Sequence, residues 1–147
     1  MSLSILSARS AQAAPHVTVE QACALLARHY GLDAHVEPLG SQQDLNFRVS
    51  VAAVQYVLKI SHADGFPAEL HAQHDALSYL AAAGLPVPGL IPNLAGHALL
   101  ALTLAGQPLF VRLLHYIEGQ PLTRCGSVSP ALVGEFGRIC ALSLIHI

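Results

Sequence analysis

Charged side chains are scarce in this 147-residue chain: Asp, Glu, Lys and Arg make up 11% of it, against roughly 25% in an average soluble domain. Hydrophobic residues make up 53%. This composition predicts an unusually apolar surface, as expected where a second lobe or domain normally covers part of it. The formal net charge of −2 gives neither the basic surface of a nucleic-acid-binding protein nor a polybasic membrane patch. We therefore expect neither nucleic acid nor membrane as a partner.

Long apolar runs and a disulfide framework are also lacking. The longest apolar run, residues 98–105, is far shorter than the ~20 residues that span a bilayer. The three cysteines are far apart and odd in number, which favours reduced thiols in a cytoplasmic protein. Residues 1–17 lack the basic start and apolar stretch of a secretion signal. We interpret them as a disordered or weakly packed leader.

Local signals predict an α+β domain with a five-stranded antiparallel sheet. Thr18 and Gln21 form a capping-box pattern at the start of an amphipathic helix that Gly31 ends. A second helix is expected over residues 67–83, followed by a proline-rich linker. Strands are expected over residues 34–39, 45–51, 55–60, 97–104 and 109–116. The second helix is thus inserted after the third strand, which is an α+β layer design.

Lys59 is the only lysine of the chain. It lies in the apolar run Tyr56–Ile60, where alternation places Val57 and Ser61 on its face. A lysine among apolar neighbours is costly to desolvate unless an anion lies nearby. The strand alone leaves two interpretations open: an edge-strand lysine that reaches water, or a phosphate-binding lysine like that of a kinase strand.

Two segments around this strand are compatible with nucleotide binding. The stretch Gly40–Phe47 begins with glycine and lies between two expected strands, so its backbone N–H groups could cover phosphates. An ordinary polar turn fits its composition equally well. The stretch Val111–Gly119 ends in a glycine, at the place where a two-lobed kinase has its hinge. A core strand that simply leaves the sheet is the other interpretation.

The helix after Lys59 carries a candidate carboxylate partner for it. Glu69 and Gln73 are four residues apart and share a helix face. A kinase-like lysine needs an acid on this helix to hold it against the nucleotide. Glu69 is the favoured residue and Asp75 the alternative, while a solvated helix face explains either one without any function.

Four motifs in register resemble a known family. In order they are Gly-Ser-x-x-Asp-x-Asn-Phe (Gly40–Phe47), Tyr-Val-Leu-Lys-Ile (Tyr56–Ile60), Gly-Leu-Pro-Val-Pro (Gly84–Pro88) and Tyr-Ile-Glu-Gly-x-Pro-Leu (Tyr116–Leu122). Together they resemble the N-lobe of the aminoglycoside phosphotransferase and choline kinase superfamily. The pattern is most similar to its hydroxylysine-kinase-like branch, which includes kinase domains fused ahead of class III, pyridoxal-phosphate-dependent aminotransferases. The resemblance covers roughly residues 18–141.

The resemblance implies an ATP site on a protein-kinase-like N-lobe. Lys59 would bind the α- and β-phosphates, and Glu69 would pair with Lys59. Ser41 and Asn46 would line the loop that covers the phosphates. His115 and Ile117 would present backbone groups to adenine. The implied boundaries are an N-lobe over residues 18–114, a hinge and linker over 115–128, and the start of a C-lobe helix over 129–141.

The catalytic residues of the family are expected outside this chain. Phosphoryl transfer needs an aspartate near the attacking hydroxyl and carboxylates that hold Mg²⁺, and the family places them in its C-lobe. No such motif follows Gly119, and His62-Ala63-Asp64 is a false match because Glu69 stands where an asparagine is required. We therefore expect no catalytic residue and no metal site here. ATP, Mg²⁺ and a small-molecule acceptor are expected for the complete enzyme, and no activity for this chain alone.

The last six residues, 142–147, have a different interpretation. Back-translated, Leu-Ser-Leu-Ile-His-Ile matches a sequencing-library adapter, so we interpret this segment as an adapter-derived tail that interrupts the helix. The rival to a kinase lobe is a non-catalytic α+β binding or scaffolding module, which predicts a stable, soluble monomer.

Overall fold

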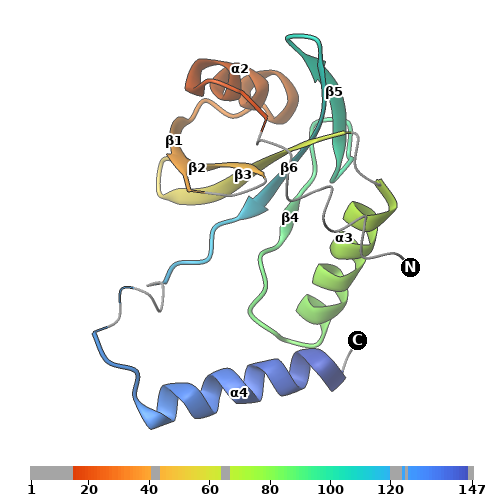
Figure 1. The fold of residues 1–147 in the computed structure, drawn as a ribbon. Coiled ribbons are helices and arrows are strands. Elements are labelled where there is room, and N and C mark those ends of the chain that lie inside the picture. The colour runs from red at the N-terminus through yellow and green to blue at the C-terminus, as the bar shows by residue number, and fades with distance from the viewer. Residues whose placement is uncertain (1–14, 41–43, 64–66, 120–123, 125, 146–147) are drawn as a thin grey trace.

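The computed structural model describes residues 15–40, 44–63, 67–119, 124 and 126–145 (Figure 1). Its helices are α2 (Val19–Tyr30), α3 (Pro67–Ala82) and α4 (Pro130–Ile145). Its strands are β1 (His35–Leu39), β2 (Leu45–Val51), β3 (Val54–His62), β4 (Leu90–Ile91), β5 (Leu100–Leu104) and β6 (Gln107–His115). Residues 1–14 of the expected leader lie outside the described part, whereas Val17 packs in the core.

Helix α2 begins and ends where its capping residues predict. The Thr18 backbone N–H donates to Gln21 Oε1 at 2.9 Å, and the Gln21 N–H donates to Thr18 Oγ1 at 3.2 Å. These reciprocal bonds satisfy N–H groups that the first helical turn leaves without an intrahelical partner. Gly31 ends the helix in the left-handed region, with φ of 68°. The helix buries Leu25 and Leu26 against the sheet.

The sheet is antiparallel throughout and has one strand more than the sequence predicts. Its order is β1-β2-β3-β6-β4, and β5 also pairs with β6. The additional strand, β4, pairs Leu90 with Leu114 and Ile91 with Leu113. Only two residues pair in this proline-rich segment, too few for a strand pattern, so the expected linker contains a short strand.

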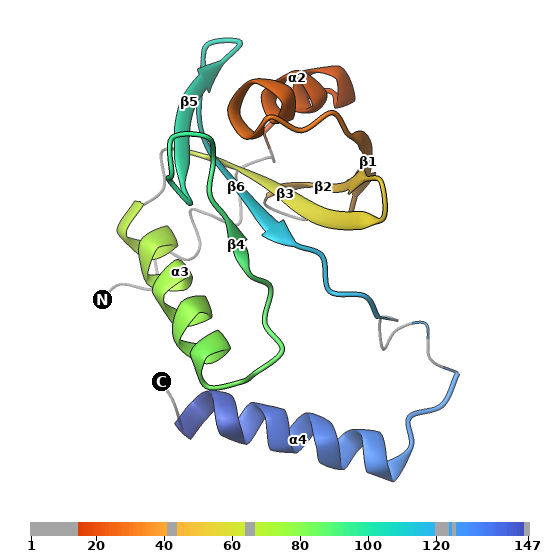
Figure 2. The same ribbon diagram turned by 180° about the vertical axis from the view of Figure 1, so that it is seen from behind.

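Side chains alternate between the two faces of the sheet and give them different roles. One face forms the hydrophobic core with α2, through Phe47, Val49, Leu58, Ile60, Val111 and Leu113. Figures 1 and 2 show α2 over this part of the sheet, with α3 at a distance from it beside β4. The residues between those core residues in sequence project from the opposite face. Polar side chains on that face form the candidate site.

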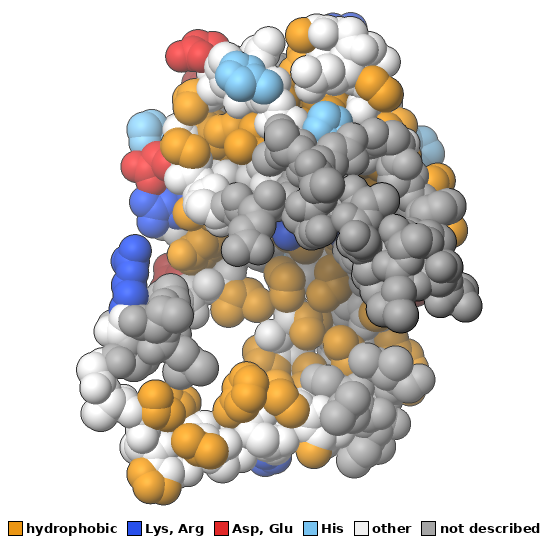
Figure 3. All heavy atoms as spheres, in the orientation of Figure 1, with side chains coloured by type: hydrophobic (Ala, Val, Ile, Leu, Met, Phe, Trp, Pro, Cys, Tyr) orange, Lys and Arg blue, Asp and Glu red, His pale blue; other side chains and the backbone are white. Residues whose placement is uncertain are grey.

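Helix α4 lies apart from the sheet (Figure 2). Ser129 caps it, because its Oγ accepts from the Leu132 N–H at 3.2 Å, as the Ser-Pro pair predicts. The helix continues to Ile145, so the interruption expected after Ala141 is not present in the structure. Figure 3 shows hydrophobic side chains along α4, which include the exposed Val133 and Phe136. Within the described residues, no helix combines the length and hydropathy needed to cross a membrane.

Candidate nucleotide-binding site

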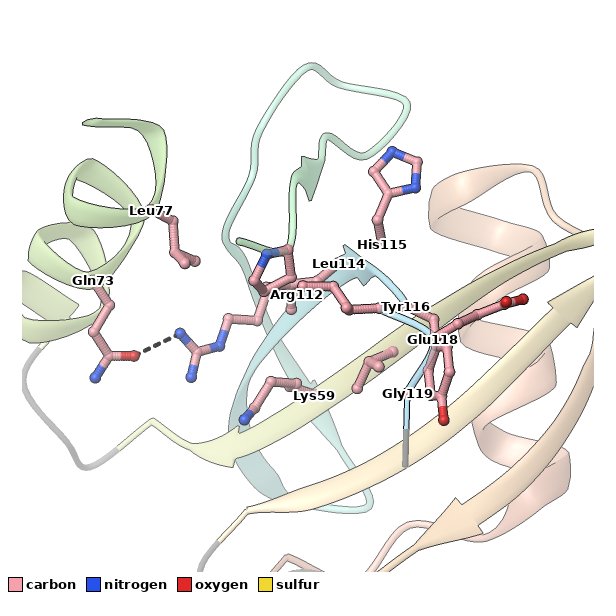
Figure 4. A pocket seen from close by; sticks show the side chains of 12 residues that line it. Lys59, Gln73, Leu77, Arg112, Leu114, His115, Tyr116, Glu118 and Gly119 are labelled. Atoms are coloured by element: carbon pink, nitrogen blue, oxygen red, sulfur yellow. Dashed lines mark hydrogen bonds between the residues drawn. The ribbon is translucent and has the colours of Figure 1, made fainter. Parts of the chain in front are cut away.

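A pocket of about 590 Å³ opens on the sheet face that α2 leaves uncovered (Figure 4). Residues from β3, α3, the segment before β4, β6 and the segment that follows β6 line it: Val57, Lys59, Gln73, Leu77, Pro88, Arg112, Leu114, His115, Tyr116, Ile117, Glu118 and Gly119. Its volume lies within the range of roughly 300–1,000 Å³ that is usual for small-molecule sites. One part of the lining is apolar, and the part around Lys59 and Arg112 is cationic.

Asp44 pairs with both cations of the pocket. Its Oδ2 lies 3.7 Å from Lys59 Nζ and 3.8 Å from Arg112 Nη2. Lys59 and Arg112 are direct cross-strand partners on β3 and β6, so their side chains emerge on the same face. The side chain of Lys59 is 30% exposed and that of Arg112 only 8%. One carboxylate oxygen is therefore shared by two neighbouring positive charges.

Asn46 extends this polar row to β2. It is the cross-strand partner of Lys59, so the three adjacent strands carry an amide, an ammonium and a guanidinium side by side. The Oδ1 atom of Asn46 is buried without a hydrogen-bond partner. A buried polar atom without a partner is costly, which makes Asn46 a residue of interest beside Lys59.

Gln73 connects α3 to the same cluster. Its Oε1 accepts from Arg112 Nη1 at 2.8 Å (Figure 4). Gln73 lies four residues beyond Glu69 on α3, and Glu69 is exposed. Lys59 forms an ion pair with Asp44 in the structure, and the pairing of Lys59 with Glu69 stays a prediction. The contact between α3 and the sheet is therefore made by the amide of Gln73 and the guanidinium of Arg112.

The segment after β6 forms the edge of the pocket where the hinge was predicted. The His115 N–H donates to the Gly89 carbonyl at 2.8 Å, and the Tyr116 N–H donates to the Gln55 carbonyl at 3.1 Å. His115 therefore has its carbonyl, but not its N–H, to offer a ligand. Ile117 lines the same edge. Ser41 lies outside the described residues.

Helix α3 also places a buried histidine near Arg112. His74 is 6% exposed. Burial, followed by the positive charges of Arg112 and His71, lowers its pKa from the ordinary value of 6.5, and Asp75 opposes this shift. His74 therefore remains neutral at pH 7 and adds no charge to the site. No cluster of three or more His, Cys, Asp or Glu side chains suited to a metal ion occurs among the described residues.

Sequence reasoning missed Arg112, Asp44 and Gln73 as members of one cluster. Arg112 is the only Asp, Glu, Lys or Arg that is buried among the described residues. The signal that could have revealed it is the one used for Lys59, a cation inside an apolar strand. Alternation within Val111–Leu114 puts Arg112 on the face opposite the core, but the sequence alone does not fix its register to Lys59.

The family model described as the phosphotransferase enzyme family matches residues 35–147. The chain belongs to this family. It is 30% identical over 146 residues to hydroxylysine kinase of Mus musculus. The alignment covers 89% of this chain and 39% of that relative. The comparison confirms the superfamily and the branch that the four motifs resembled.

Solved structures show the same fold. A microcompartment-associated aminopropanol kinase matches with a TM-score of 0.68 at 23% identity, over 84% of this chain and 39% of that one. A spectinomycin phosphotransferase in complex with ADP and spectinomycin matches at 0.57 with 15% identity, over 78% and 34% of the two chains. An amicoumacin kinase in complex with AMP-PNP and Ca²⁺ matches at 0.58 with 18% identity, over 88% and 36%. The chain thus spans well under half the length of each of these relatives, and it has the α+β fold of their N-terminal lobes.

Proposed function

We propose that this chain is the ATP-binding lobe of a small-molecule kinase that phosphorylates a hydroxyl of an amine or amino-acid-like acceptor. The observation that carries the proposal is the cationic end of the pocket, where Lys59 and Arg112 reach Asp44, the residue that directly precedes β2. A polyphosphate is the small-molecule group that such a cluster suits best, because it offers several oxygens to charged donors. Nucleotides in the complexes of two structural relatives support this assignment.

The residues present fit ATP at both ends of the pocket. Val57, Leu114 and Ile117 offer apolar surface for a base, and the His115 carbonyl and the Ile117 backbone are proposed to read its polar edge. Lys59 and Asn46 are proposed to hold the phosphates, together with Ser41 in the covering loop. The unpartnered Oδ1 atom of Asn46 supports a ligand at this end, since a flipped amide would present its NH₂ group there.

ATP would supply the phosphoryl group, and the residues of this chain would bind and orient it. The acceptor class is inferred from hydroxylysine kinase and aminopropanol kinase, both named for amino alcohols. The groups that hold Mg²⁺ and activate the hydroxyl are proposed to lie in a C-lobe, because the relatives extend well beyond the matched region. This chain alone is therefore proposed to be inactive. A class III aminotransferase domain in the complete protein stays a prediction.

The test is binding of AMP-PNP by the protein expressed from its complete reading frame. We expect Lys59→Ala to weaken binding by about tenfold or more, because a charged hydrogen-bond donor contributes roughly 1.5–3 kcal/mol. Circular dichroism would confirm that the variant is folded. Equal affinity of the wild type and Lys59→Ala would remove the role of Lys59, and a folded wild type that binds no nucleotide would refute the proposal.

A further inference from the structure

We propose that Arg112 is a second phosphate-binding cation of this site, and that Asp44 is the counter-ion that holds Arg112 and Lys59 until phosphate replaces it. The inference rests on the proposed function and deepens it. Its basis is the arrangement of two cations that reach one carboxylate oxygen, at 3.7 and 3.8 Å.

The register of the sheet makes the pair of cations unusual. Lys59 and Arg112 are directly opposite each other on neighbouring strands, a position in which like charges repel and destabilise a sheet. Arg112 is also withdrawn from water, with 8% of its side chain exposed. Burial of a charge is costly unless it is paired. The Oδ2 atom of Asp44 faces both cations at 3.7 and 3.8 Å, so an anionic ligand that entered here would meet two cationic donors.

Gln73 orients Arg112 without cancelling its charge. The hydrogen bond from Arg112 Nη1 to Gln73 Oε1, at 2.8 Å, fixes the plane of the guanidinium. An amide in this place adds no negative charge, whereas a carboxylate would neutralise the arginine. A fixed guanidinium can donate two parallel hydrogen bonds to phosphate oxygens, which an ammonium cannot do.

Asp44 occupies the position that a phosphate oxygen would take between the two cations. It directly precedes β2. Entry of a polyphosphate would exchange one bridging oxygen for several, so the carboxylate and the ligand compete for the same donors. Removal of the carboxylate charge should therefore raise affinity for phosphate groups.

A purely structural role is the rival explanation, in which Arg112 only ties α3 to the sheet through Gln73. The two roles are separated by comparing AMP-PNP with adenosine, which has no phosphate, in calorimetric titrations of the protein from its complete reading frame. We expect Arg112→Met to weaken AMP-PNP binding about 10- to 100-fold and to leave adenosine binding unchanged. Gln73→Met, which removes the tether and keeps Arg112, should retain most of the preference for AMP-PNP. Arg28→Met, an exposed change of equal charge on α2, is the matched control.

Two further variants keep the test decisive if Arg112→Met does not fold. Lys59→Ala leaves Arg112 in place and should still bind AMP-PNP at least about tenfold more tightly than adenosine. Asp44→Asn should bind AMP-PNP a few-fold more tightly than the wild type, because the substitution removes a negative charge that repels phosphate. Weaker binding by Asp44→Asn would overturn the role of counter-ion.

The remaining outcomes distinguish this inference from the function on which it rests. If Lys59→Ala loses all preference for AMP-PNP, or if Gln73→Met loses as much affinity as Arg112→Met, Arg112 is not a phosphate ligand although the nucleotide site stands. The same holds if folded Arg112→Met binds AMP-PNP like the wild type. If the folded wild type binds adenosine and AMP-PNP equally or not at all, the proposed function fails, and the inference fails with it.

Discussion

Gln73 on α3 and Arg112 on β6 are joined by a hydrogen bond of 2.8 Å between Oε1 and Nη1. They are 39 residues apart in the sequence, and the contact joins a helix to the face of the sheet that carries the pocket. An amide accepts this bond although a carboxylate would form a stronger one with arginine. This choice leads to a first prediction about stability and binding.

Gln73→Glu should stabilise the protein and weaken nucleotide binding at the same time. A carboxylate at position 73 would form an ion pair with Arg112, but residue 73 is exposed, so the free energy of unfolding should rise by no more than about 1 kcal/mol. The new negative charge would repel phosphate groups and lower affinity for AMP-PNP by a few-fold. Denaturant unfolding and calorimetric titration measure the two effects, with Gln73→Met as the uncharged control. An increase in both stability and affinity would contradict the assignment of a cationic phosphate site.

The buried His74 should make folding sensitive to mild acid. Burial and the positive charge of Arg112 lower the pKa of His74 from 6.5, so the unfolded chain takes up a proton more readily than the folded protein. The stabilising contribution is complete above the unfolded pKa of about 6.5 and is lost as the pH falls below that value through the folded pKa. His74→Leu should remove this part of the pH dependence of the free energy of unfolding.

An NMR titration gives a direct measurement of the same effect. The imidazole of His74 should titrate below pH 6.5, and Arg112→Met should move its pKa upward because a neighbouring positive charge is removed. If the pKa of His74 in the wild type lies above 6.5, the environment of α3 described here is wrong.

The start of α2 offers a local test of the fold. Thr18→Ala should lower the free energy of unfolding by about 1 kcal/mol, because it leaves the Gln21 N–H without its capping acceptor. Thr18→Ser keeps the hydroxyl and should cost much less. Thermal unfolding followed by circular dichroism measures both variants. Equal losses in the two variants would show that the methyl group, and not the cap, is what matters.

The apolar side chains of α4 should make the isolated chain prone to association. Val133 and Phe136 are 57% and 58% exposed, and Figure 3 shows hydrophobic side chains along this helix. Val133→Ser combined with Phe136→Ser should reduce binding of a hydrophobic dye and increase the monomeric fraction in analytical ultracentrifugation. Strong association that these substitutions leave unchanged would place the responsible surface elsewhere.

Local chemistry explains which parts of the fold could be predicted. The capping box of Thr18 with Gln21, the left-handed Gly31 and the alternation around Lys59 depend on residues close in sequence, and the structure confirms them. Strand β4 could not be predicted, since two residues pair only because β6 offers them an edge. Long-range register decides such a strand, and one sequence does not contain it.

The candidate site shows the same division. The apolar strand around it makes Lys59 recognisable from sequence, and the contact of Glu69 on α3 with Lys59 stays a prediction. The carboxylate that reaches it, Asp44, lies two residues before the cross-strand neighbour Asn46. That proximity depends on the pairing of β2 with β3. Arg112 was missed for the same reason, because its register to Lys59 is a property of the assembled sheet.

The hydrogen bond from the His115 N–H to the Gly89 carbonyl attaches the segment between α3 and β4 to the edge of the pocket. Gly89 follows the turn that ends this helix, and a Cβ there would lie 3.1 Å from Cδ2 of His115. Gln73 attaches α3 itself to the sheet through Arg112, whereas Gly89 attaches the linker that follows the helix. A side chain introduced at Gly89 would press on the His115 ring and so would change the shape of the pocket at that edge, while the bond between Gln73 and Arg112 at the other edge would remain.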